Sequence, residues 1–138
     1  PLILIGVAVA LIFGLYSVAN AGLKVEPTLD PTTVVKSYYD ALNSQDLETA
    51  MSFIADDAVM SYPDGKFQGK EMIQRVVQGW LAGNFRSENS NYRESNGEVR
   101  YDYKVYFGDN LVDQDTDGLT IVKDGKIVFD GLEKDKPQ

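Results

Sequence analysis

Three aspartates in the second half of the chain have a spacing that suits cation binding. Asp113, Asp115 and Asp117 occupy alternate positions, Gly118 follows them, and Asp124 stands at the twelfth position of the segment. This order matches the opening of a calcium-binding loop. However, no predicted helix flanks the segment, and its closing residue is aspartate in place of the longer glutamate. We therefore expect an acidic segment that holds no metal, with calcium as the alternative.

The same aspartates constrain the local backbone. In an unbroken strand over residues 111–121 they would share a face with Leu119 and Ile121. That arrangement would bury unpaired charges beside apolar side chains. The sequence therefore predicts a bulge or turn between Asp115 and Gly118.

Four aromatic residues are candidates for a ligand pocket. Tyr38, Tyr62, Trp80 and Tyr103 lie on different predicted elements, and their rings would suit a flat apolar ligand. The alternative for each is core packing, with a hydroxyl or indole group reaching a polar partner. The sequence alone does not choose between an open pocket and a filled one.

Composition excludes several kinds of chemistry. The 138 residues include no cysteine and no histidine, which excludes thiol catalysis, disulfides, histidine base catalysis and the usual zinc, haem or copper sites. We expect no cofactor. The formal net charge of −8 lies entirely from Lys24 onward, which makes the folded part acidic and argues against nucleic acid as a partner.

The amino-terminal segment differs from the rest of the chain. Residues 2–18 contain no charged side chain, and residues 1–23 are long enough for a transmembrane helix. Residues 19–21 have the small-x-small form of a signal-peptidase site, but the apolar run exceeds a typical signal core. We predict a retained transmembrane helix, in contact with the bilayer over residues 2–23. Gly6, Ala10 and Gly14 would provide packing surfaces for other membrane helices.

The remaining boundaries follow from composition. Residues 24–30 form a polar linker with Pro27, and Pro31 follows at the start of the first helix. Residues 31–132 form the domain, and residues 133–138 form a solvated tail. The export-like signature predicts a single-pass membrane protein whose domain is periplasmic, lumenal or extracellular.

Helical periodicity precedes strand periodicity in the domain. Asp30 can cap a helix with Val34, Val35, Tyr38, Ala41 and Leu42 on one face. Asp46 can cap a second helix whose apolar face ends at Ile54, and a third runs from Gly69 to Leu81. Strands are expected over 58–62, 66–68, 86–94, 99–107, 111–123 and 126–129. This order predicts an α+β fold with an antiparallel sheet curled around three helices.

The domain resembles the nuclear transport factor 2-like superfamily, in particular its SnoaL-like and ketosteroid isomerase branches. The resembling segments span about residues 31–132 and are Val34-Val35-x-x-Tyr38, Ala41-Leu42-Asn43, Asp46-Leu47, Ala55-Asp56-Asp57-Ala58-Val59, Gly69-Lys70-Glu71 and Asp124-Gly125-Lys126-Ile127. The resemblance implies a cone-shaped sheet that is open to a pocket at one end.

The resemblance also implies site residues. In ketosteroid isomerases a tyrosine of the first helix and a neutral aspartic acid of a late strand donate hydrogen bonds to an oxyanion, and a carboxylate moves the proton. Tyr38 and Asp117 match the first two positions. The base position is Tyr62, and a neutral phenol is a poor proton acceptor. We therefore predict no catalytic residue, and take Tyr38, Tyr62, Trp80, Tyr103 and Asp117 as pocket candidates.

These observations favour a non-catalytic accessory subunit of a photosynthetic, respiratory or secretion complex in a membrane. Its expected partners are the transmembrane helices and extramembrane surfaces of that complex. The alternative is a membrane-tethered isomerase- or cyclase-like enzyme, or a protein that binds a small apolar ligand in the cone.

Overall fold

Helix α2 (Pro31–Asn43) begins where the sequence predicts its cap. The computed structural model describes residues 29–138. The Asp30 carboxylate accepts a hydrogen bond from the Thr33 backbone N–H at 3.1 Å, and Pro31 occupies the first turn, where no N–H is needed. Five side chains on one face of α2 are buried, namely Val34, Val35, Tyr38, Ala41 and Leu42.

Two further helices follow. Helix α3 (Leu47–Ser52) is capped by Asp46, which accepts from the Thr49 N–H at 3.1 Å. It is shorter than predicted, because Ile54 pairs with Ile127 in the sheet instead of extending the helix. Helix α4 (Lys70–Ala82) buries Ile73 and Val77 but leaves Met72 exposed.

The sheet contains six strands: β1 (Ile54–Tyr62), β2 (Gly65–Gln68), β3 (Phe85–Ser95), β4 (Glu98–Phe107), β5 (Asn110–Lys123) and β6 (Lys126–Gly131). Their spatial order is β2-β1-β6-β5-β4-β3. The predicted all-antiparallel pairing is wrong at one place, since β1 and β6 are parallel. Parallel neighbours need a long crossover connection. Here the chain between β1 and β6 runs through β2, α4, β3, β4 and β5.

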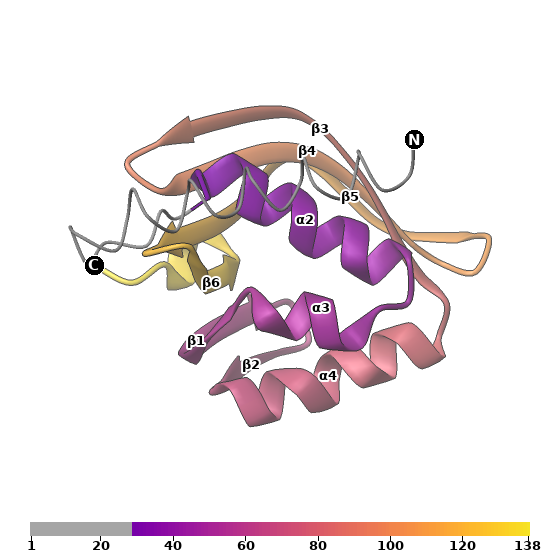
Figure 1. Ribbon diagram of the computed structural model, residues 1–138. Coiled ribbons are helices and arrows are strands. Elements are labelled where there is room, and N and C mark those ends of the chain that lie inside the picture. The colour runs from indigo at the N-terminus through magenta and orange to yellow at the C-terminus, as the bar shows by residue number, and fades with distance from the viewer. Residues whose placement is uncertain (1–28) are drawn as a thin grey trace, which may run out of the picture.

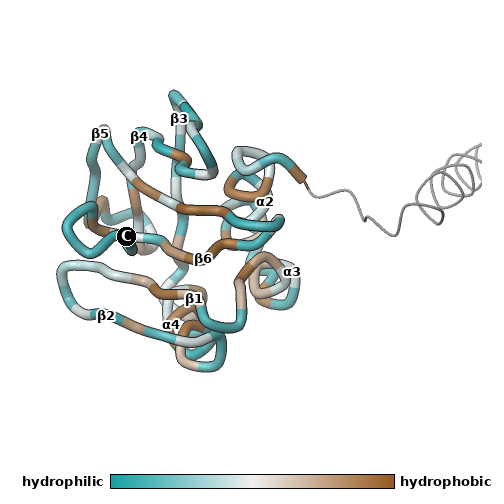
Figure 2. Tube along the Cα trace, turned by 90° about the vertical axis from the view of Figure 1, so that its left-hand side faces the viewer, coloured by the Kyte–Doolittle hydropathy of each residue, from teal (hydrophilic) through white to brown (hydrophobic). Residues whose placement is uncertain are grey.

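The strands curve around the helices. Figure 1 shows β3, β4 and β5 arching over α2, with α3 and α4 beside β1 and β2. Apolar segments gather in the middle of the domain in Figure 2, whereas the hairpin ends of β3, β4 and β5 are hydrophilic. The core therefore fills only the part of the curve that the helices cover, and the α+β fold with a curved sheet matches the sequence prediction.

Strand β5 contains the predicted bulge. Tyr101 pairs with Gly118 and Tyr103 pairs with Asp115, so the β5 side has one extra residue between the two pairs. The exposure of the strand differs on the two sides of the bulge. Residues 110–117 are exposed, whereas Leu119 is buried. The bulge keeps the aspartates out of the core.

Residues 133–138, which were predicted to be a solvated tail, are exposed or half-buried and contact the domain. Residues Glu133–Asp135 form a 3₁₀ turn. Arg100 donates to Glu133 at 2.7 Å, and Ser61 donates to Asp135 at 2.5 Å. These contacts hold the segment against β1 and β4.

Within residues 29–138 no helix has the length and apolar character needed to cross a bilayer. The predicted membrane helix over residues 1–23, with Gly6, Ala10 and Gly14, lies outside the described residues, as does most of the linker.

Candidate functional site

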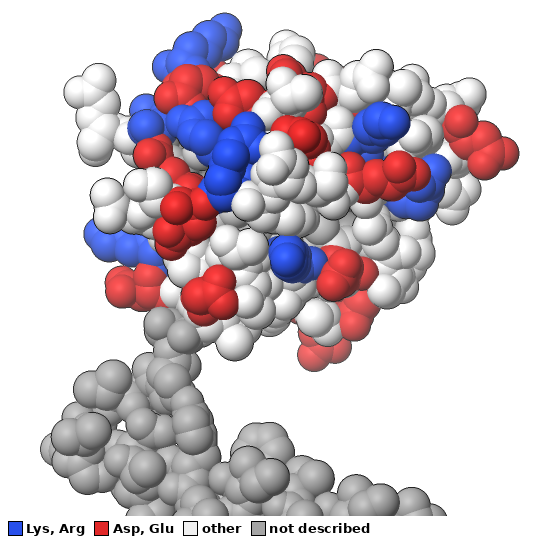
Figure 3. Space-filling view, turned by 90° about the horizontal axis from the view of Figure 1, so that it is seen from above, with Lys and Arg blue, Asp and Glu red and all other residues white. Residues whose placement is uncertain are grey.

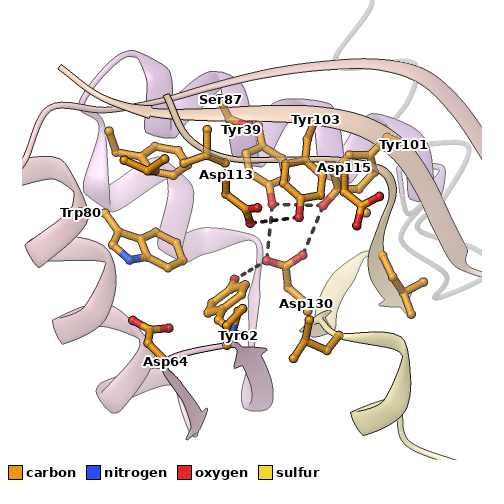
Figure 4. Close-up of a pocket in the computed structure, with 18 of the residues that line it drawn as sticks. Tyr39, Tyr62, Asp64, Trp80, Ser87, Tyr101, Tyr103, Asp113, Asp115 and Asp130 are labelled. Atoms are coloured by element: carbon orange, nitrogen blue, oxygen red, sulfur yellow. Dashed lines mark hydrogen bonds between the residues drawn. The ribbon is translucent and has the colours of Figure 1, made fainter. Parts of the chain in front are cut away.

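An open cavity of about 720 Å³ lies between the curved sheet and α4. This volume falls within the range of roughly 300–1,000 Å³ that is common for small-molecule sites. Side chains from α2, α4 and all six strands line it. Figure 4 shows ten of the lining residues by name, with Trp80 on one side and Asp130 at the inner end.

Asp130 of β6 stands at the inner end of the cavity. The residue is 3% exposed, and its carboxylate accepts hydrogen bonds from four hydroxyl groups. Tyr62 donates to Oδ2 and Tyr39 lies 3.4 Å from the same atom. Thr120 and Tyr101 lie 2.6 and 3.3 Å from Oδ1. We call these five residues the floor cluster. Figure 4 shows the bonds of Asp130 with Tyr39, Tyr62 and Tyr101 as dashed lines.

The floor cluster is also linked within itself. The hydroxyls of Tyr101 and Thr120 are 2.7 Å apart, and those of Tyr39 and Tyr101 are 3.1 Å apart. Each residue comes from a different element: α2, β1, β4, β5 or β6. The network therefore exists only in the completed fold.

Burial perturbs the acidity of the cluster. Desolvation raises the pKa of Asp130 above its ordinary value, and the hydrogen bonds from Thr120, Tyr62 and Tyr101 oppose part of that effect. Desolvation followed by the charge of Asp130 raises the pKa of Tyr62 well above its ordinary value. Asp130 is therefore the group of this cluster that titrates at the lower pH, with the phenols staying protonated.

Aromatic rings form the sides of the cavity. The Trp80 indole stacks on Phe85 with a centroid distance of 5.4 Å and an interplanar angle of 17°. Tyr62 meets Trp80 edge-on at 5.4 Å, and Phe107 meets Phe85 at 5.9 Å. The aromatic wall comprises Phe67, Trp80, Phe85, Tyr103 and Phe107. It offers flat apolar surface directly beside the polar floor.

Acidic residues surround the outer part of the cavity. The acidic rim comprises Asp64, Asp113, Asp115, Asp117 and Glu133, all of them exposed. Tyr103 donates to Asp113 at 3.1 Å, and burial together with the Asp113 charge raises the pKa of that phenol. Among the described residues no lysine or arginine lines the cavity.

Four of the five predicted pocket residues line the cavity: Tyr62, Trp80, Tyr103 and Asp117. Tyr38 does not. It is fully buried within the core, and its neighbour Tyr39 reaches the cavity instead. The helical period explains the difference, since consecutive residues on α2 point about 100° apart and Tyr38 shares the core-facing side with Val34, Val35 and Leu42.

Asp117 does not have the buried, neutral environment that the resemblance implied. Its side chain is 56% exposed and pairs with Arg100 at 3.2 Å and Arg93 at 3.6 Å. The buried acid is Asp130, which sequence reasoning missed because Asp130-Gly131 resembles a turn after the predicted end of the last strand at Phe129. The available signal was an acid directly following the apolar run Ile127-Val128-Phe129.

The three aspartates of the calcium-like pattern all line the cavity. In the part of the chain that the structure describes, no group of three acidic side chains is arranged to hold a metal ion. The three aspartates instead belong to strand β5, so their backbone does not form the loop between two helices that a calcium-binding loop requires.

Comparison with known proteins agrees with this geometry. Residues 35–129 match the family model described as "SnoaL-like domain". An NTF2-like protein of unknown function from Cytophaga hutchinsonii is similar in structure, with a TM-score of 0.66, 17% identity and coverage of 78% of this chain and 91% of its own. A search of curated proteins gave no match.

Two other solved structures show how widely the fold is used. An LEH-like epoxide hydrolase from M. tuberculosis superposes with a TM-score of 0.65 and 18% identity, covering 75% of this chain and 81% of its own. A de novo designed protein with a curved β-sheet superposes with a TM-score of 0.59 and 17% identity, covering 73% of this chain and 81% of its own. At these identities the similarity establishes the fold alone.

Proposed function

The chain belongs to the SnoaL-like domain family, and we propose that it uses the cavity to bind a small, mainly apolar molecule and to exchange a proton with it through Asp130. The alternative of a pocket protein, which the sequence left open, is thereby preferred to a purely structural role. The observation that carries the proposal is a buried carboxyl group at the inner end of an open cavity.

A purely structural explanation of Asp130 is weak. Burying an acid without a cation costs free energy, and no described lysine or arginine pairs with it. Replacing the acid and its hydroxyl partners with apolar side chains would often be neutral or stabilising. Perturbed acids in clefts are typical of functional sites.

The chemistry follows from the floor cluster. In its ionised form Asp130 can remove a proton from a carbon beside a ligand carbonyl: the C–H bond breaks, an O–H bond forms on Asp130, and the electron pair moves to the carbonyl oxygen. Phenolic hydroxyls are suitable donors to that oxygen. Tyr39, Tyr62 and Tyr101 line the same end of the cavity, so one that turns from Asp130 would supply the bond.

The test combines binding with proton exchange. Trp80 is the only tryptophan and lines the cavity, so its fluorescence reports occupancy. We expect cyclic ketones to quench it, and the protein in D₂O to incorporate deuterium next to their carbonyl groups. Asp130→Asn should abolish incorporation while quenching remains. Tyr38→Phe, outside the cavity, should change neither.

Quenching of Trp80 fluorescence without deuterium incorporation would support ligand binding but refute the proton-transfer step. Absence of both, across ketones of different ring sizes, would refute the proposal. The conservative variant Tyr62→Phe separates the roles: it removes one hydroxyl of the floor cluster, so it should lower the exchange rate without removing quenching.

A second candidate function rests on residues 1–23. Their apolar composition supports the predicted role as an accessory subunit, anchored in a membrane beside the helices of a larger complex. Tethering and ligand binding are compatible. Co-purification of the full chain from detergent extracts tests this role, since isolation as a monomer without partner helices would count against it.

A further inference from the structure

We propose that the ligand of this cavity is an organic cation: an apolar ring that lies against the aromatic wall, with an amine or quaternary ammonium group at the acidic rim. This inference rests on the proposed function, because it specifies the chemical class of the molecule that the same cavity takes. It depends on the charge of the lining, on the state of the rim carboxylates and on the rings beside them.

The charge of the lining is one-sided. Six of its residues are acidic, comprising the acidic rim and Asp130, and no described lining residue is basic. The arginines and lysines lie elsewhere. On the face seen in Figure 3 they are interspersed with carboxylates and form no positive patch. An anionic ligand would enter against this potential, whereas a cation would be attracted.

The rim acids differ in their neutralisation. Asp117 pairs with Arg93 and Arg100, and Glu133 pairs with Arg100 and Lys136. No ion pair with a described residue involves Asp64, Asp113 or Asp115. Three exposed carboxylates, one from the β1–β2 turn and two from β5, therefore line the cavity without a cationic partner among the described residues.

The aromatic wall adds a second, independent attraction for the same ligand class. A cation over the face of an indole or phenol ring is attracted by the negative face of the ring quadrupole. The protein already uses such contacts outside the cavity, with Lys36 over Tyr92 and Arg86 over Tyr106. None of the described cations occupies a ring of the aromatic wall. Figure 4 shows Trp80 beside Asp64, and Tyr103 beside Asp113 and Asp115.

The cavity therefore pairs apolar ring surface with unneutralised negative charge, which suits a molecule that has both an apolar ring and a positive group. The floor cluster remains available for a hydroxyl or carbonyl group at the far end of that molecule. This arrangement assigns the rim to recognition and leaves the proton chemistry to Asp130.

The experiment compares three matched probes with the full chain. Benzyltrimethylammonium carries the charge, neopentylbenzene is its uncharged carbon isostere, and benzylsulfonate is an anion of similar size. Trp80 fluorescence measures each Kd. We expect the cation to bind about tenfold more tightly than the isostere, which corresponds to two or three weak, partly screened charge contacts. Its affinity should fall as salt shortens the Debye length.

Two double variants locate the effect. Asp113→Asn with Asp115→Asn should weaken cation binding about tenfold and leave the isostere unchanged. Asp56→Asn with Asp57→Asn changes the net charge equally at exposed β1 positions outside the cavity, so it should have little effect. Equal loss in both variants would mean that net charge alone attracts the cation, and would overturn the assignment to the rim.

The remaining outcomes separate the two proposals. If the isostere or the sulfonate binds as tightly as the cation, the charge inference fails and the cavity stays a ligand site. If none of the probes changes Trp80 fluorescence and ketones do not either, the proposed function fails together with it.

Discussion

Asp130 shows how one residue connects stability with chemistry. Its carboxyl group is buried among hydroxyls of Tyr39, Tyr62, Tyr101 and Thr120. The hydroxyls satisfy the acceptor atoms, but they carry no charge that would offset the loss of water around an ionised acid. The folded state therefore favours the protonated form of Asp130 more than the unfolded chain does.

The raised pKa of Asp130 predicts a defined dependence of stability on pH. The folded state binds the Asp130 proton more tightly than the unfolded chain does, so protonation of Asp130 stabilises the fold. This stabilisation is fully present below the pKa of Asp130 in the unfolded chain, about 3.9, and is lost as pH rises through its pKa in the folded state. Relative to Asp130→Asn, the wild type should lose up to about 1.4 kcal/mol of unfolding free energy per pH unit in that window. Urea unfolding of both proteins between pH 4 and 8 measures the difference.

Tyr38→Phe is the matched control for that series. In the described structure the Tyr38 hydroxyl is buried without a hydrogen-bond partner. Its removal should leave stability unchanged or raise it by about 1 kcal/mol, with no change in pH dependence. A flat difference between wild type and Asp130→Asn across the whole range would contradict the raised pKa.

At the level of single residues, sequence reasoning found the side chains but not all of their environments. Periodicity placed Tyr38 correctly on the apolar face of α2, and the same fact excludes it from the cavity. The sequence predicted Asp117 for the position of the buried acid, which Asp130 occupies. Burial of an acid depends on strands that meet only in three dimensions.

The bulge in β5 is the element on which the cavity wall depends. A Cβ atom at Gly118 would stand 2.8 Å from ring atoms of both Tyr101 and Tyr103. Only glycine therefore allows these rings to lie over the bulge. The bulge itself was predictable, since the charge pattern of residues 113–121 required an irregular strand there. That Tyr101 and Tyr103 lie over it could not be inferred without the register of β4 and β5.

Gly118→Ala should accordingly destabilise the domain by about 1–3 kcal/mol and weaken quenching of Trp80 by cavity ligands. Gly79→Ala provides a control of opposite sign. Gly79 lies in α4 with no atom within 4 Å of its added Cβ, so the alanine should stabilise the helix by about 1 kcal/mol. Thermal unfolding compares the two. A neutral Gly118→Ala would show that the rings can move freely.

For the whole molecule, the order of helices and strands was sufficient to predict the α+β fold, because the periods of 3.6 and 2 separate cleanly along the chain. The parallel pairing of β1 with β6 was not predicted, since no local signal records which distant strands meet. The open cavity was also undetermined, because aromatic residues fit a filled cone equally well.

The predicted membrane helix is tested at this scale. The full chain should partition into the detergent phase, because residues 1–23 are long and apolar enough for the proposed membrane helix. Detergent phase separation followed by gel analysis measures the partitioning. Recovery of the full chain in the aqueous phase would refute the anchor.

Strand β6 lies between β1 and β5, although it is the last of the six strands in chain order. A nascent chain that has emerged from the ribosome only as far as residue 125 has β1 with β2 on one side and β3 to β5 on the other, with no strand to join them. Asp130 and its hydroxyl partners meet only when this strand inserts. The lining of the cavity is therefore complete only after residues 126–131 have left the exit tunnel.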